Sequence, residues 1–199
     1  QEVILSCGSI NTPKILMLSG IGPADHLQSH GIKVLHHSPG VGLGLQDHPC
    51  IWVSAETSVP SWNDVFTPWG MAGAGLEWLL RRRGPAASAM CQVTAYGSSG
   101  REVEDRTPDF QINMTPTGYK VLDHGVEFLP GSSMTAAVSL CRPQGRGHVR
   151  LRSADPGQPP EVVYNLLDSP DEIARLTAAC RMVREIYGTD PLKRLIKGE

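Results

Sequence analysis

The chain lacks several features that would assign it to a specialised class of protein. None of its apolar runs approaches the roughly 20 residues that a helix needs to cross a bilayer, so the sequence predicts no transmembrane segment. Basic residues are not in excess, because the formal net charge is −2, and this argues against a nucleic-acid-binding protein. The remaining composition, 40% hydrophobic and 19% charged, is typical of a globular protein.

Cysteine is also sparse, with five residues in 199. Their odd number and wide spacing favour reduced and mostly buried thiols over a disulfide framework. We therefore expect a reducing compartment such as the cytoplasm. The five are Cys7, Cys50, Cys91, Cys141 and Cys180.

A strand, a glycine turn and a helix are predicted at the start of the chain. The apolar residues 3–5 predict a buried strand, and Gly8 then lets the backbone turn tightly. Thr12 can cap a helix in which Pro13 occupies the first turn, and Gly20 can end that helix with a positive φ. Nucleotide-binding α/β proteins use this arrangement, although an ordinary structural strand-turn-helix gives the same pattern.

Three sequence blocks resemble the signatures of one enzyme family. Residues 8–22 read GSINTPKILMLSGIG, residues 39–49 read PGVGLGLQDHP, and residues 146–156 read RGHVRLRSADP. In this order they resemble the glucose–methanol–choline (GMC) oxidoreductases, flavoenzymes that oxidise alcohols, and most closely the choline-dehydrogenase-like branch. Two positions depart from the family pattern: Gly44 stands where Asn is usual, and Gly145 stands where Ser is usual.

The resemblance implies FAD as the cofactor and a small-molecule alcohol as the substrate. In such enzymes a histidine takes the hydroxyl proton while a hydride passes from carbon to flavin N5, and the electrons then reach oxygen, a quinone or another acceptor. It also implies that two short segments line the FAD site. The implied cofactor-binding residues are Ser6, Cys7, Gly8, Ser9, Gln46, Asp47 and His48. No catalytic residue and no metal ligand is assigned.

Two elements of a complete family member are missing from the sequence. Nothing resembles the Gly-x-Gly-x-x-Gly turn that holds the FAD pyrophosphate, and nothing resembles the segment with the catalytic His and its His or Asn partner. We therefore interpret the chain as the middle of a longer FAD-dependent oxidoreductase acting on the CH–OH group of primary alcohols, choline-like or other. The alternative is a truncated, non-catalytic remnant or interaction module that keeps the substrate-domain fold.

The predicted fold class is α+β. Residues 1–50 are expected to form the end of an FAD-binding, Rossmann-like α/β domain, with a helix over 23–30 and a short strand over 32–35. Residues 51–199 are expected to form an antiparallel-sheet substrate-binding domain with flanking helices, in which the family's C-terminal region starts near residue 135 and is incomplete. Hydrophobic patterning predicts its strands, at 51–55, 91–96, 110–114, 134–141, 148–152 and 162–164.

Two helices are predicted in this second domain. The first covers about residues 70–82, with Leu76, Leu79 and Leu80 facing inward. The second begins at a capping box in residues 169–172. Its apolar residues recur at helical spacing, which indicates packing on a sheet: Ile173, Leu176, Cys180, Val183 and Tyr187.

Histidines, arginines and large apolar side chains offer competing interpretations. His26 and His30 are spaced i,i+4, with His36 and His37 nearby, and such spacing can hold zinc for a metal-dependent hydrolase; surface histidines explain it better. The three arginines at 81–83 suit the end of a helix, as a solvated cap rather than an anion site. Three further side chains could face the substrate, although core packing is the expected role of each: Trp52, Trp69 and Met114.

Overall fold

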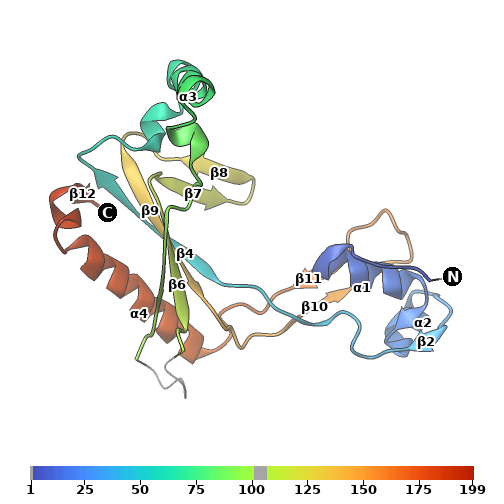
Figure 1. The fold of residues 1–199 in the computed structure, drawn as a ribbon. Helices are drawn as coiled ribbons and strands as arrows, with labels where there is room; N and C mark the ends of the chain where they lie inside the picture. Colours follow the sequence, from blue (N-terminus) through green and yellow to red (C-terminus); the bar gives the residue numbers. More distant parts are fainter. Residues whose placement is uncertain (1, 101–106) are drawn as a thin grey trace. The chain divides into compact units, whose positions relative to one another are not determined.

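The computed structural model describes residues 2–100 and 107–199 and divides the chain into two compact units. The first unit contains Gln1–His48 and Pro143–Pro170, and the second contains Pro49–Arg142 and Asp171–Glu199. Each unit therefore combines stretches that are distant in the sequence. Helices and antiparallel sheets occur in both, so the predicted α+β fold class is confirmed (Figure 1).

The first unit has a small core and short elements. A parallel pair joins β1 and β2, and a three-stranded antiparallel sheet has the order β11-β10-β3. Met17, Leu27, Val149 and Leu151 form the buried core. The elements are α1 (Gly8–Leu18), β1 (Ile21–Gly22), α2 (Ala24–Ser29), β2 (His36–His37), β3 (Leu43–Leu45), β10 (Gly147–Arg150) and β11 (Glu161–Val163).

Two glycines permit close backbone contacts in this unit. A Cβ at Gly42, where φ is +83°, would lie 2.2 Å from the carbonyl oxygen of Val149. The Val149 amide donates to the Gly42 carbonyl at 2.7 Å. A Cβ at Gly147 would lie 1.7 Å from the carbonyl oxygen of Val163. Any larger residue at either position would force the backbone segments apart.

The predicted strand over residues 3–5 is wrong. Val3 and Ile4 are 87% and 80% exposed, and no described segment pairs with them. A strand is stabilised by hydrogen bonds to a neighbouring strand, so apolar character alone does not form one here.

Other local predictions in this unit are partly confirmed. The helix over 23–30 is confirmed as α2. Pro13 lies inside α1 rather than in its first turn, because the helix already begins at Gly8. The strand expected over 32–35 is wrong, because Ile32 and Val34 pack against the core without strand pairing and the strand β2 comes directly after residue 35.

The second unit is built on a five-stranded antiparallel sheet of order β12-β4-β9-β6-β5 (Figure 1). The hairpin β7–β8 and the helices complete this unit. The strands are β4 (Cys50–Thr57), β5 (Val93–Gly97), β6 (Phe110–Thr115), β7 (Tyr119–Leu122), β8 (Gly125–Phe128), β9 (Ser133–Leu140) and β12 (Ile196–Gly198). The helices are η1 (Trp62–Val65), α3 (Pro68–Arg81), η2 (Pro85–Ala87), α4 (Pro170–Tyr187) and η3 (Leu192–Arg194).

Strand register gives the five-stranded sheet an apolar face and a polar face. Residues directly opposite each other on neighbouring strands point to the same face. On the apolar face, one row contains Val53, Ala136, Met114 and Val93, and the next row contains Ile51, Val138, Ile112 and Ala95. On the polar face, one row contains Trp52, Ala137, Asn113 and Thr94, and the next row contains Cys50, Ser139, Gln111 and Tyr96.

Helix α4 packs along this sheet and confirms the last predicted helix (Figure 1). Leu176 and Val183 are almost fully buried. The Tyr187 hydroxyl donates to the carbonyl oxygen of Val53 at 3.0 Å. Ile173, which was expected in the same stripe, is 51% exposed, whereas the neighbouring Glu172 is buried.

Helix α3 has no buried residue, contrary to expectation. Leu76, Leu79 and Leu80 are 56%, 60% and 72% exposed. The helix contacts mainly the short helices η1 and η2, and these leave its leucines uncovered. Among the described helices, none combines the length and the apolar character that crossing a membrane requires.

The side chain of Asn63 joins η1 to the base of the β7–β8 hairpin. Its Nδ2 donates to the carbonyl oxygens of Gly118 (2.9 Å) and Leu129 (2.8 Å), and its Oδ1 accepts from the Gly118 amide (2.8 Å). Gly118 and Leu129 flank the two strands of the hairpin. One amide therefore holds both ends of the hairpin through three hydrogen bonds.

Candidate cofactor and substrate sites

The first predicted cofactor segment, residues 6–9, lies at the start of α1. All four residues are exposed, and Cys7 makes no side-chain cap. Gly8 has φ +80°, and no atom lies within 4 Å of the position that its Cβ would occupy. The first N–H groups of a helix have no partner within the helix and can bind a polar ligand. The segment is therefore open to a cofactor.

The second predicted segment, Gln46, Asp47 and His48, follows β3 and is also exposed. The Asp47 carboxylate accepts from the backbone amide of His48 at 2.8 Å. Asp47 thus orders the backbone of the segment.

Both segments lie in the first unit, where α1 contacts β10 and β10 pairs with β3. No hydrogen bond among the described residues joins one segment to the other. Gly44, the departure from the family pattern, has φ +76° with open space beside it. Glycine and asparagine adopt this conformation most readily, so the backbone suits the usual Asn as well. The open segments and this conformation are compatible with a bound FAD.

Two of the four clustered histidines accept hydrogen bonds from backbone amides. His26 Nε2 accepts from the Leu151 amide at 3.0 Å, and His37 Nδ1 accepts from the Ala24 amide at 3.1 Å. Burial lowers the pKa of His26, and the nearby His30 and Arg150 lower it further. No group of three potential metal ligands gathers among residues 2–100 and 107–199.

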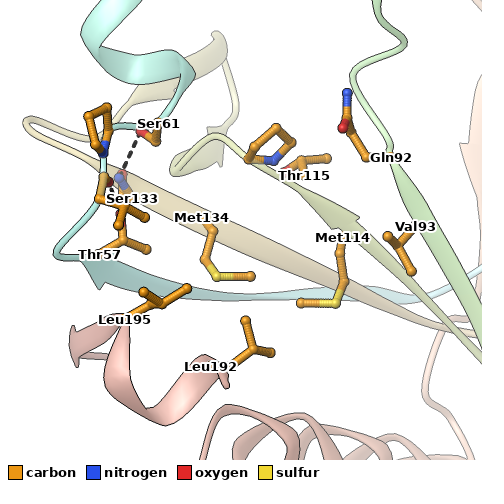
Figure 2. Close-up of a pocket in the computed structure, with 13 residues that line it drawn as sticks. Thr57, Ser61, Gln92, Val93, Met114, Thr115, Ser133, Met134, Leu192 and Leu195 are labelled. Atoms are coloured by element: carbon orange, nitrogen blue, oxygen red, sulfur yellow. Dashed lines mark hydrogen bonds between the residues drawn. The ribbon is translucent and has the colours of Figure 1, made fainter. Parts of the chain in front are cut away.

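A hollow of about 380 Å³ lies on the apolar face of the five-stranded sheet, beside η3 (Figure 2). Met114 and Met134 point into it from the sheet, and Leu192 and Leu195 point into it from the η3 region. None of its lining residues can take up or release a proton near neutral pH. This hollow therefore offers no acid–base chemistry. Met114 was expected to pack in the core, but it is only half-buried and points into the hollow.

The polar face of the same sheet carries a hydrogen-bonded cluster around Asn113. Its Oδ1 accepts from the Thr94 hydroxyl (2.9 Å) and from Gln111 Nε2 (2.8 Å), and the Cys91 sulfur lies 3.6 Å from the same oxygen. The sequence interpretation missed this cluster. Its signal was the alternation of polar Gln111, Asn113 and Thr115 with apolar residues along β6.

The two tryptophans that were expected in the core lie elsewhere. Trp52 is 39% exposed on the polar face, and Trp69 is 88% exposed on α3.

All five cysteines are free, as predicted, but only Cys180 is buried, so the expectation that most are buried is wrong. Burial raises the pKa of Cys50 to about 11, which keeps this thiol protonated at neutral pH.

Comparison with known sequences assigns the chain to a family. Sequence models of the GMC oxidoreductases match residues 1–50 and residues 143–198, together more than half of the chain. The chain belongs to the GMC oxidoreductase family. The predicted resemblance is therefore confirmed.

GMC relatives extend the match to the region between these segments. An oxygen-dependent choline dehydrogenase of Brucella ovis is 36% identical over 189 residues, or 94% of this chain and 34% of the relative. The corresponding protein of Rhizobium etli is 35% identical over the same shares. The chain thus spans about a third of the length of the curated relatives that it matches.

Solved structures agree with this GMC fold. A formate oxidase variant of Aspergillus oryzae RIB40, studied for FAD modification, has a TM-score of 0.84 and 26% identity over 100% of this chain and 39% of its own. A fungal aryl-alcohol oxidase has a TM-score of 0.70 and 23% identity over 97% of this chain and 39% of its own, which supports the fold alone.

Proposed function

We propose that this chain is part of an FAD-dependent oxidoreductase that oxidises the CH–OH group of a primary alcohol. The two GMC matches, to residues 1–50 and 143–198, carry this proposal. The choline dehydrogenase relatives and the FAD named for the formate oxidase neighbour support the same chemistry.

In this proposal the first unit binds the cofactor. The exposed residues 6–9 at the start of α1 and the segment 46–48 would hold FAD through backbone groups and short side chains. The Cys7 amide already donates to the Thr12 hydroxyl at 3.1 Å. When bound, FAD would supply the acceptor for the hydride of the alcohol carbon. Asp47 would keep the second segment in one conformation through its hydrogen bond to the His48 amide.

The second unit would contribute the wall of the substrate site through its sheet. No residue of this chain is assigned to proton transfer, because nothing in the sequence resembles the family segment that carries the catalytic His. The free thiols favour a reducing compartment.

Purification of the full-length protein tests this proposal. We expect a flavin absorbance spectrum, release of FAD on denaturation, and alcohol-dependent reduction of the flavin. Asp47→Ala should lower the FAD content, whereas Asp155→Ala, on an exposed turn of the same unit, should leave it unchanged. A full-length protein without flavin would contradict the proposal and favour the non-catalytic remnant.

A further inference from the structure

The polar face of the five-stranded sheet carries one row of four residues that combines hydrogen-bonding side chains with an aromatic one. Across β5, β6, β9 and β4 this row contains Thr94, Asn113, Ala137 and Trp52, and we call it the Asn113 row. The small side chain of Ala137 separates Asn113 from Trp52. Since neighbouring strands lie about 4.8 Å apart, the backbones of these two residues are about 10 Å apart.

The amide of Asn113 is held in one orientation. Two donors converge on its Oδ1, namely the Thr94 hydroxyl (2.9 Å) and Gln111 Nε2 (2.8 Å), and the Cys91 sulfur lies 3.6 Å from the same oxygen. The oxygen therefore faces these donors, and Nδ2 faces away from them. Among the described residues no group accepts a hydrogen bond from Nδ2. Asn113 as a residue is half-buried, so part of its surface is open to solvent.

The surroundings of the row are uncharged. The neighbouring row on the same face contains Cys50, Ser139, Gln111 and Tyr96. Burial raises the pKa of Tyr119, and hydrogen bonding to Trp52 and Thr115 offsets only part of that rise, so the phenol is neutral. Helix α4 packs on the opposite face. A neutral donor beside an exposed indole suits a ligand with an uncharged oxygen and an apolar skeleton.

We propose that Asn113 is a substrate-binding residue whose Nδ2 donates a hydrogen bond to an oxygen of the alcohol, while the carbon skeleton of the alcohol packs on Ala137 and Trp52. This inference rests on the proposed alcohol oxidation and extends it to named residues. Thr94 is a positioning residue, because it acts on the substrate only through the orientation of the Asn113 amide.

Steady-state kinetics of the full-length holoenzyme test the role of Asn113, with benzyl alcohol and choline as probes. Asn113→Asp keeps the shape and the accepting oxygen but replaces the Nδ2 donor by a charged carboxylate oxygen. Asn113→Leu removes both hydrogen-bonding atoms without adding a charge, and the uncharged benzyl alcohol is therefore the probe that decides for Asn113→Asp. We expect kcat/KM for the oxidised probe to fall about tenfold in each variant, the loss typical of one hydrogen bond. Met114→Leu, one position along β6 and facing the apolar side, should stay within about twofold of the wild type.

A second pair of variants separates positioning from folding. Thr94→Ser keeps the hydroxyl that fixes Asn113 and should retain the wild-type KM. Thr94→Val removes this hydroxyl and should raise KM at nearly unchanged kcat. FAD content and the unfolding midpoint of each variant serve as folding controls. If the flavin-loaded variants of Asn113 keep wild-type kcat/KM, the assignment of Asn113 is wrong. A wild-type protein without flavin, or without turnover of either probe, would instead overturn the proposed oxidation.

Discussion

The two units of the molecule are stabilised in different ways. The first unit buries four core side chains, Met17, Leu27, Val149 and Leu151. It depends on backbone contacts so close that Gly42 and Gly147 exclude any Cβ. The second unit buries long side chains between a wide sheet and α4. We infer that backbone shape limits substitution in the first unit, whereas side-chain volume limits it in the second. Variants in each unit can test this contrast.

The largest expected effect is in the second unit. Phe110 is fully buried on β6 and packs against Gly97. Phe110→Ala should lower the free energy of unfolding by about 4 kcal/mol, because it removes a buried ring and leaves a cavity. Phe66→Ala, at a ring that is 41% exposed, is the matched control and should cost less. Urea unfolding measures both, and equal losses would contradict the contrast.

Gly42→Ala should have the next largest effect, and it should act on the first unit. The added methyl would meet the Val149 carbonyl oxygen, and φ of +83° is unfavourable for alanine. We expect a loss of about 3 kcal/mol in stability, seen as faster hydrogen exchange in residues 1–48 and 143–170. Gly40→Ala, with open space around it, should be neutral. Equal exchange in both variants would show that the contact is relieved cheaply.

A smaller effect is expected from Tyr187→Phe. This change removes the hydrogen bond to the Val53 carbonyl while keeping the buried ring. Burial raises the Tyr187 pKa to about 12, so the hydroxyl is protonated and donates at neutral pH. We expect a loss of about 1 kcal/mol in the free energy of unfolding. Tyr96→Phe, at an exposed ring, should change nothing, and an unchanged Tyr187→Phe would show that packing alone fixes α4.

The smallest effect is a pH dependence confined to the first unit. The pKa of His26 is lowered in the folded state, so the unfolded chain binds more protons as pH falls below about 6.5. Protonation also removes the acceptor for the Leu151 amide. The first unit should therefore lose stability as pH falls through this range, and hydrogen exchange corrected for its intrinsic pH dependence measures the loss. His26→Ala should remove the dependence, whereas His48→Ala, at an exposed ring, should retain it.

The sequence predicted elements whose pattern is local. Helix α4 and the strands β4 and β9 follow from their spacing of apolar residues. The predictions of a strand over 3–5 and of inward-facing leucines in α3 were wrong. Periodicity identifies an apolar surface, but it does not show whether a neighbouring element covers that surface. The Asn113 cluster depends on pairing between β5 and β6, which a single strand's pattern does not reveal. The cofactor-binding residues stay predictions.

The three hydrogen bonds of Asn63 have an evolutionary consequence. Because one side chain fixes both ends of the β7–β8 hairpin, changes at the exposed tip, such as at Val121 or Val126, are insulated from the sheet. Tyr119, which stands next to Gly118 at this fixed end, keeps its position beside Trp52. Substitutions at the hairpin tip should therefore leave the sheet and the Trp52 surface unchanged.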